Sequence, residues 1–355
     1  MQHQQQQQQQ HHECPHVEET YDTTKYQHRN LINSKYVFER KIGKGSFGCI
    51  YQGVNIVTQE KVAIKYEATT CTQPTLVWES KILNHLSGIP GVVKLRYFGT
   101  ESNKNIIVMD LFSHTLAEEV IKLKKTASYA VFNRKYESGS ESETSDYGEI
   151  ELDDPIYKYY LKDVLKYMIS IIEIIEKIHE KGVIHRDIKP ENFMISQSRI
   201  QDNHTDPTEQ TDPAEQVNKK LNIIDFGLSR IYIKDGTHIQ NKQNSSIVGT
   251  MRYISTHIHE GNVYSRRDDI ISILYVIIYL LKGRLPWCGL KVEPSDKRTK
   301  AEIVYEVKKR TPIPILCTGL PSIFERMLTY AYKIGFEEKP DYIYLKRLCK
   351  QELGI

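Results

Sequence analysis

Two short motifs contain polar residues whose types and spacing suit the transfer of a phosphoryl group. The first, G-V-I-H-R-D-I-K-P-E-N, contains Asp187, Lys189 and Asn192, and the second, I-I-D-F-G-L, places Asp225 before a Phe-Gly pair. Phosphoryl transfer needs a carboxylate that accepts the hydroxyl proton, a cation that stabilises the moving phosphate, and oxygen ligands for Mg²⁺. We assign Asp187 to the first role, Lys189 to the second, and Asn192 with Asp225 to the metal.

Both aspartates could instead have ordinary structural roles. Asp187 follows a His-Arg pair and could cap a turn, and Asp225 could cap the end of a strand. The K-P-E-N sequence after Asp187 argues against a simple turn. The apolar run L-N-I-I before Asp225 predicts a buried strand that delivers the carboxylate into a cleft, which favours a metal ligand.

A glycine-rich segment upstream suits the binding of nucleotide phosphates. G-K-G-S-F-G at residues 43–48 fits the pattern G-x-G-x-x-G-x-V, with Ile in place of Val. Glycine lets the backbone approach phosphate oxygens closely. Dinucleotide-binding folds share the spacing, but here the segment lies between two strand-like runs, which favours the hairpin of a protein kinase. The predicted ATP contacts in this segment are Ile42, Gly43, Lys44, Gly45, Ser46, Phe47, Gly48, Cys49 and Ile50.

The motif V-A-I-K places Lys65 at the end of an apolar strand. An unpaired lysine is costly to bury there, so we expect it to meet phosphate oxygens and a carboxylate. Glu79 is the best partner by spacing, although both residues could be ordinary surface charges. By order along the chain, backbone groups of Asp110 to Phe112 are assigned to the adenine edge, with Met109 as the side chain behind it. Ala63 is a further predicted ATP contact.

The elements around these motifs change from strand-like to helical along the chain. Alternating and β-branched runs predict strands near residues 49–54, 61–64, 92–98 and 105–109. A single helix is expected among them, at residues 76–86. Apolar residues then recur at steps of three and four, which predicts a long amphipathic helix before the H-R-D motif; they are Leu161, Leu165, Met168, Ile172, Ile175 and Ile178.

We therefore predict an α+β, two-lobed protein kinase fold over residues 34–355. Its small β-rich N-lobe should cover about 34–112 and its larger, mainly helical C-lobe about 113–355. Residues 1–33 are rich in Gln and His, and we expect a disordered tail. Two stretches that cannot bury a core, one acidic and one with a repeated T-D-P-x-E-Q hexamer, indicate insertions at about 126–155 and 197–219.

Composition excludes several other classes of protein. The net charge is +3, and the six cysteines are scattered without a C-x-x-C pair, which disfavours a zinc site and suits a reducing compartment. The first residues lack an apolar core, so no signal peptide is expected. The apolar run 270–281 is shorter than the ~20 residues that span a bilayer. We expect an intracellular monomer, cytoplasmic or nuclear, without nucleic-acid or membrane partners.

Motifs after Gly227 are more specific. The chain reads G-T-M-R-Y-I-S, then S-R-R-D-D and L-P-W-C-G-L-K, and it has E-S-K-I around Glu79. These motifs resemble the casein kinase I family of serine/threonine protein kinases, over about residue 36 to the end except the two insertions. The sequence departs from the family at S-T-H (residues 255–257), where the family has S-I-N, and at Leu274, where it has a small residue.

The resemblance implies ATP and Mg²⁺ as cofactors, and protein substrates with an acidic or phosphorylated residue upstream of the target Ser or Thr. Arg252, in the matched G-T-x-R-Y motif, is expected to bind that upstream charge, together with Lys297 and Lys300. The basic segment 297–300 could also be a solvated loop or a nuclear localisation signal.

Two other functions remain to be weighed. A scaffold with a kinase fold but no chemistry is disfavoured, because Lys65, Asp187, Asn192 and Asp225 are all present. A tyrosine or small-molecule kinase is disfavoured by Lys189, which lies two residues after Asp187 and favours short hydroxyl acceptors.

Overall fold

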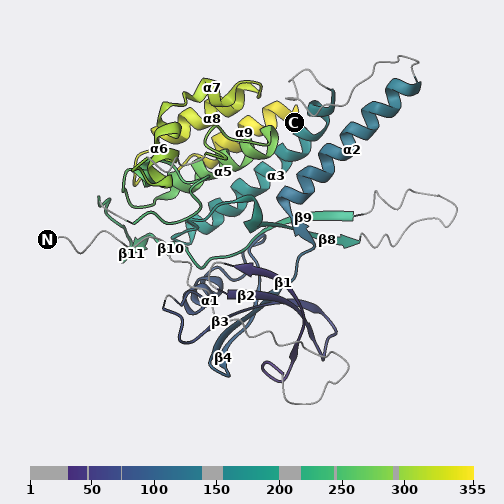
Figure 1. The fold of residues 1–355 in the computed structure, drawn as a ribbon, viewed down its shortest axis with the longest axis vertical. Helices are drawn as coiled ribbons and strands as arrows, with labels where there is room; N and C mark the ends of the chain where they lie inside the picture. The colour runs from purple at the N-terminus through teal and green to yellow at the C-terminus, as the bar shows by residue number, and fades with distance from the viewer. Residues whose placement is uncertain are drawn as a thin grey trace. The chain divides into compact units, whose positions relative to one another are not determined.

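The computed structural model describes residues 31–45, 48–72, 74–137, 155–199, 217–243, 246–290 and 296–355. These residues form two compact units. The smaller contains residues 31–84 and 93–111, and the larger contains 85–92 and 112–355. The smaller unit is mostly sheet and the larger mostly helix (Figure 1), which confirms the predicted α+β class.

The smaller unit is built on one antiparallel sheet with the strand order β1-β2-β3-β5-β4. Its elements are β1 (Tyr36–Gly45), β2 (Gly48–Asn55), β3 (Lys61–Ala68), α1 (Leu76–His85), β4 (Leu95–Glu101) and β5 (Lys104–Asp110). The strands lie close to the predicted ranges, except that β3 is longer and β4 begins later. Val62 and Ile64 on β3 and Ile106 and Val108 on β5 alternate toward one core, as the period of two in a strand requires.

Ile32 belongs to this core although it lies within the range expected for the tail. It is buried and forms a β-bridge with Tyr36. Leu31 and Ile32 are an isolated apolar pair without periodicity, so the sequence pattern could not reveal the burial of Ile32.

The larger unit has its longest helices at α2 (Leu116–Glu137), α3 (Pro155–Glu180) and α5 (Arg266–Lys282). Its shorter helices are α4 (Thr256–His259), α6 (Lys300–Arg310), α7 (Ile313–Cys317), α8 (Ser322–Lys333), α9 (Tyr342–Leu353) and the 3-10 turn η1 (Pro190–Asn192). α3 packs against both α2 and α9 (Figure 1). The apolar spacing that predicted a long helix before the H-R-D motif is thus confirmed by α3.

Short strands of the larger unit lie beside the motifs. β6 (His114–Thr115), β8 (Phe193–Arg199) and β9 (Val217–Ile223) form a three-stranded sheet, and β10 (Arg230–Ile231) pairs with β7 (Val183–Ile184). β11 (Ile233–Lys234) pairs with β12 (Thr237–His238). β8 and β9 bring the segment after Asn192 and the segment before Asp225 side by side.

The two expected insertions are only partly described. α2 continues to Glu137, so residues 126–137 of the first one are helical, and residues 138–154 lie outside the described residues. The second lies between β8 and β9, and its residues 200–216 are outside the described residues, as are residues 1–30 of the expected tail.

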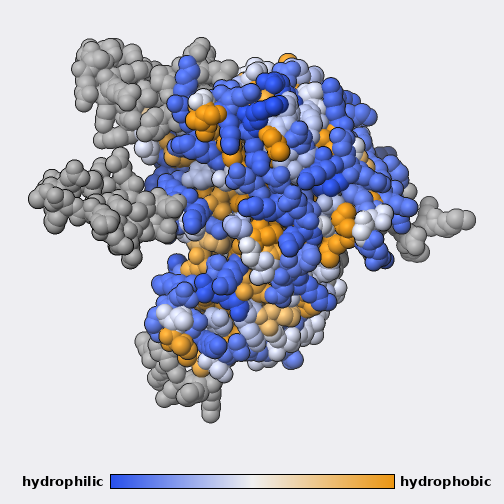
Figure 2. Space-filling view, turned by 180° about the vertical axis from the view of Figure 1, so that it is seen from behind, coloured by the Kyte–Doolittle hydropathy of each residue, from blue (hydrophilic) through white to orange (hydrophobic). Residues whose placement is uncertain are grey.

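The apolar run 270–281 forms the body of α5, and nearly all of its side chains are buried. Among the described residues, no helix has the length and apolar character needed to cross a membrane. Figure 2 shows one face of the molecule, where hydrophilic residues predominate and hydrophobic ones lie in separate patches.

Candidate functional site

Lys65 and Glu79 form a buried ion pair in the smaller unit. The Lys65 Nζ atom lies 2.8 Å from Glu79 Oε2, and the two residues are 4% and 0% exposed. Two charges so deeply buried need close pairing, because each has lost its water. The pair fits the lysine and helical glutamate that position ATP phosphates in a protein kinase.

Besides Glu79, a carboxylate on β3 belongs to the site and was not predicted from the sequence. It fixes the helix that carries Glu79. Glu67 is buried, and its two oxygens accept hydrogen bonds from the backbone nitrogens of Thr75 (2.9 Å) and Leu76 (3.1 Å). Backbone donors at the start of a helix have no partner within the helix, and Glu67 supplies one here. The helix dipole also stabilises a negative charge at this end. Because Lys65 and Glu67 lie two residues apart, one face of β3 both supplies the lysine and holds its partner helix.

The glycine-rich segment is a strand hairpin, as its flanking runs predict. Gly45 pairs with Gly48 across β1 and β2, and Gly43 pairs with Ile50. Ser46, Phe47 and the side chain of Lys44 lie outside the described residues. At Gly48 an added Cβ would lie 2.1 Å from the Tyr66 carbonyl oxygen, so a larger residue would force β2 away from β3. Ile42 is exposed, and Cys49 is partly buried.

The predicted ATP contacts Ala63, Met109, Asp110 and Phe112 are split between the sheet and the connection after it. Ala63 and Met109 are direct partners across β3 and β5, and both are buried. Asp110 ends β5, and its carboxylate accepts a 2.7 Å hydrogen bond from Arg96 Nε. This bond occupies the Asp110 side chain, in keeping with adenine contacts made by backbone groups. Phe112 belongs to the larger unit.

The structure brings Asp187, Lys189 and Asn192 together. They lie in the segment from His185 to Asn192, which we name the catalytic loop. Lys189 Nζ donates to Asp187 Oδ2 at 2.5 Å, and Asn192 Nδ2 donates to the Asp187 carbonyl oxygen at 2.9 Å. Thr250 Oγ1 donates to the other carboxylate oxygen, Oδ1, at 2.7 Å. Thr250 lies in the G-T-x-R-Y motif, but its contact with Asp187 was not predicted from the sequence.

The residues assigned to Mg²⁺ are adjacent and suit that ion. Asn192 donates through its amide nitrogen, which leaves the amide oxygen as the atom able to bind a cation. The backbone of Ile224, directly before Asp225, donates to the Asn192 carbonyl oxygen at 3.0 Å. No group of three or more His, Cys, Asp or Glu side chains suited to a metal occurs among the described residues. Mg²⁺ with nucleotide needs only one or two protein oxygens, since phosphates and water complete its coordination.

Two non-glycine residues beside the chemistry have left-handed backbone conformations. Arg186 has φ of 68° and Asp225 has φ of 64°. Such conformations carry strain and persist where the surroundings hold them. Phe226, which follows Asp225, is fully buried with its ring centroid 4.9 Å from that of His185. His185 in turn contacts the Ile224 carbonyl oxygen at 3.1 Å through Nε2.

Asp269, at the start of α5, holds the strained catalytic loop. Its Oδ2 accepts from the backbone nitrogen of His185 (2.7 Å) and its Oδ1 from that of Arg186 (3.0 Å). Burial alone would raise the pKa of Asp269, but the hydrogen bonds from His179 and from the His185 backbone hold it below the ordinary value. Asp269 is the last residue of the S-R-R-D-D motif, and its role in holding the loop was not predicted from the sequence.

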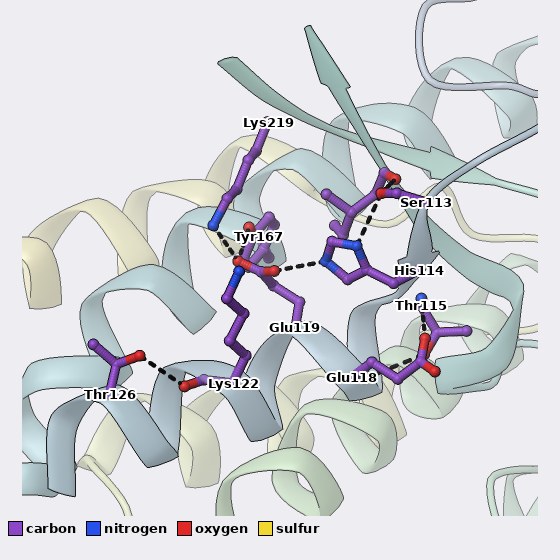
Figure 3. A network of polar contacts seen from close by, with 10 residues as sticks. Ser113, His114, Thr115, Glu118, Glu119, Lys122, Thr126, Tyr167 and Lys219 are labelled. Atoms are coloured by element: carbon purple, nitrogen blue, oxygen red, sulfur yellow. Dashed lines mark hydrogen bonds and ion pairs between the residues drawn. The ribbon is translucent and has the colours of Figure 1, made fainter. Parts of the chain in front are cut away.

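A network around Glu119 fixes the strand that leads to Asp225 (Figure 3). The buried Glu119 carboxylate on α2 accepts from His114 Nε2 (2.6 Å), Lys219 Nζ (2.7 Å) and the Tyr167 hydroxyl (3.2 Å). Burial alone would raise the pKa of Glu119, but the bonds from Lys219 and His114 hold it below its ordinary value. Because Lys219 lies on β9 and Tyr167 on α3, the network joins α2, α3 and β9.

Two partly buried histidines near the G-T-x-R-Y loop predict loss of stability in acid. Burial lowers the pKa of His257 to about 4, with Arg267 contributing, and that of His259 to about 3, with Lys308 contributing. In the unfolded chain each of these histidines takes up a proton near pH 6.5, whereas in the folded chain it does so only near pH 4 or below. The folded state therefore keeps its full stability above pH 6.5 and loses stability as the pH falls from 6.5 toward 4. Burial raises the pKa of Asp268 to about 6, so the folded chain takes up a proton there before the unfolded chain does. This uptake partly offsets the loss of stability in acid.

We therefore expect the thermal midpoint to fall between pH 7 and pH 4.5, and to fall less in His259→Gln. Differential scanning fluorimetry across this range measures both proteins. The same pH dependence in both would show that His259 is not neutral in the folded state.

Comparison with known protein families agrees with the geometry of both units. Residues 36–318 match the protein kinase domain family, which is most of the chain and includes every motif from the glycine-rich hairpin to α7. A protein kinase domain uses ATP with a divalent metal and acts on protein substrates. The chain belongs to the protein kinase family and is a phosphotransferase.

Proposed function

We propose that this kinase is serine/threonine-specific and of casein kinase I type, and that it acts on Ser or Thr downstream of an acidic or phosphorylated residue. The observation that carries the proposal is the setting of Arg252. This arginine is exposed, yet its guanidinium carbon lies 5.1 Å from the ring centroid of Tyr279 and 5.7 Å from that of Tyr253. Stacking on two rings orders the guanidinium at little cost in solvation.

Arg252 keeps its positive charge available. Among the residues that the structure describes, no carboxylate forms an ion pair with it. Arg252 Nη1 makes a 3.4 Å hydrogen bond to the Tyr253 hydroxyl, and the remaining N–H groups of this exposed guanidinium suit the oxygens of a phosphate or carboxylate. This is the chemistry needed to recognise an upstream acidic or phosphorylated residue.

Three hydrogen bonds from side chains to backbone carbonyl oxygens hold the loop that carries Arg252. Lys308 Nζ donates to Met251 (2.7 Å) and to Ile254 (2.6 Å), and Trp287 Nε1 donates to Arg252 (2.8 Å). These three bonds fix the backbone on both sides of the arginine. A fixed backbone favours discrimination between charged and uncharged substrates, because less freedom is lost on binding.

Lys297 and Lys300 are the further cations that we propose for this anion site. Arg298 between them is taken by Asp296, with Nη2 2.6 Å from Oδ2. Lys300 is the first residue of α6, and both Lys297 and Lys300 are exposed. A solvated loop remains the second candidate role for this segment, because exposed lysines are common and bind ions weakly.

The proposed chemical roles follow the contacts of the catalytic loop. Asp187 orients and deprotonates the acceptor hydroxyl, and Lys189 stabilises the transferred phosphoryl group. Asn192 and Asp225 hold Mg²⁺, which neutralises charge on the phosphates when it is bound. The hairpin at residues 43–48 and Lys65 bind the ATP phosphates, and Ala63, Met109, Asp110 and Phe112 bind adenine. Lys189 and Thr250 both contact Asp187, which suits a short Ser or Thr acceptor.

The remaining proposals concern extent and setting. The kinase domain covers residues 34–355. We propose that it works inside the cell, in cytoplasm or nucleus, as a monomer. The absence of paired cysteines among the described residues favours a reducing compartment.

Replacement of Arg252 tests the proposal. Arg252→Ala should lower the ratio of kcat/KM for a peptide with phosphoserine three residues before the acceptor to kcat/KM for its unphosphorylated twin. A charge-assisted bond to phosphate contributes about 1.5–3 kcal/mol, so the ratio should fall by roughly tenfold or more. Arg298→Ala, at an exposed arginine paired with Asp296, is the matched control and should leave the ratio unchanged. Equal losses on both peptides would mean that Arg252 only supports the loop.

A further inference from the structure

The Asp269 carboxylate that grips the catalytic loop is itself linked to the C-terminal helix α9. His179 on α3 places its ring Nε2 3.0 Å from Asp269 Oδ2. The other ring nitrogen, Nδ1, lies 2.6 Å from the hydroxyl oxygen of Tyr342, the first residue of α9. All three side chains are buried.

The chemistry of these groups fixes where the protons lie. An ionised carboxylate only accepts hydrogen bonds, so His179 Nε2 carries a proton and donates it to Asp269. In the neutral ring Nδ1 is then an acceptor. Burial raises the pKa of Tyr342 far above its ordinary value, so its hydroxyl keeps its proton and donates it to Nδ1. Tyr342 therefore selects the tautomer of His179 that can donate to Asp269.

Helix α9 is firmly placed for this task. Leu345 and Leu348 are buried, and Lys346 Nζ lies 2.6 Å from Glu176 Oε2 on α3. The Asp341 side chain caps the helix by accepting from the Tyr344 backbone nitrogen at 2.8 Å. The residues that match the protein kinase family end at 318, so Tyr342 lies outside them. Its link to the catalytic loop runs through His179 and Asp269.

We propose that Tyr342 is a positioning residue for phosphoryl transfer, acting through His179 and Asp269 on the backbone of His185 and Arg186. Asp187 follows directly, so the placement of its carboxylate depends on this chain of contacts. Without the Tyr342 hydroxyl, Nδ1 would be a buried acceptor with no donor. The ring would then be free to change tautomer, and Asp269 would hold the strained loop less firmly. The proposal rests on kinase activity alone, not on the substrate preference argued above.

The test is Tyr342→Phe, which removes one oxygen and keeps the buried ring. We expect kcat to fall roughly tenfold, with KM for ATP changed by less than about twofold, because displacement of a catalytic group lowers turnover more than binding. Tyr344→Phe, two residues along the same helix and only partly buried, is the matched control and should keep wild-type kcat.

The second readout is the ring tautomer of His179 in protein labelled with ¹⁵N-histidine, assigned by the signal lost in His179→Gln. Wild-type enzyme should show the form protonated at Nε2 alone, and Tyr342→Phe should not. Wild-type kcat in Tyr342→Phe would overturn the proposal. A loss of kcat with an unchanged His179 signal would also overturn it, since the effect would then come from general loosening of α9.

Discussion

Asp187→Asn should lower kcat by about 10²–10⁴-fold, the range for loss of a general base that acts in the transition state. Asparagine has the size of aspartate and can still accept the hydrogen bond from Thr250, so the loop should keep its shape. It can neither accept the hydroxyl proton nor offer a charge to Lys189, whose ammonium lies 2.5 Å from the carboxylate.

Steady-state phosphorylation of a peptide, with the thermal midpoint measured in parallel, separates loss of chemistry from loss of fold. Asp163→Asn is the matched control, because Asp163 pairs with Lys166 on the exposed side of α3. The control should keep wild-type kcat. Normal turnover by folded Asp187→Asn enzyme would remove Asp187 from the chemistry.

Lys65→Met should reduce kcat/KM for ATP by at least about 100-fold, because the phosphates lose their cation. Glu79 also loses the partner 2.8 Å away, and breaking a buried pair from one side costs about 3–5 kcal/mol of folding free energy. The variant should therefore be both inactive and less stable.

The double variant Lys65→Met/Glu79→Gln separates these two effects. Glutamine removes the uncompensated charge, so the thermal midpoint should recover while activity stays low. ATP turnover that recovers together with stability would show that Lys65 acts only through folding. Wild-type use of ATP by the single variant would contradict the phosphate contact altogether.

Local spacing was enough to predict the parts of the site that lie close together in sequence. Asp187, Lys189 and Asn192 are within six residues, so any compact loop brings them near one another. The pairing of Lys65 with Glu79 follows from a strand and a helix joined by a short connection. The strands and the long helix α3 were predictable for the same reason, since periods of 2 and 3.6 are written in neighbouring residues.

The supports of the site come from distant parts of the chain, and no local pattern reveals them. Asp269 lies 84 residues from the backbone nitrogen of His185 that it binds, and Thr250 lies 63 residues from Asp187. Glu67 caps α1 from the preceding strand, where nothing distinguishes it from a surface carboxylate. The helical part of residues 126–137 was also unforeseen, because the surrounding acidic sequence masks a weak apolar period.

The proposal that Lys297 and Lys300 share the anion site with Arg252 rests on sequence resemblance, because residues 291–295 lie outside the described residues. The ring contacts of Arg252 support its own part in that site.

The measurement that bears most directly on the proposed function is the wild-type ratio of kcat/KM for the primed peptide to kcat/KM for its unphosphorylated twin. Each peptide is prepared with Ser, Thr or Tyr as acceptor. Arg252, ordered and exposed in the G-T-x-R-Y loop, predicts a ratio of roughly tenfold or more for Ser and Thr acceptors. No transfer to Tyr is expected. A ratio near one, or faster transfer to Tyr, would contradict a casein kinase I type of activity while leaving the kinase assignment intact.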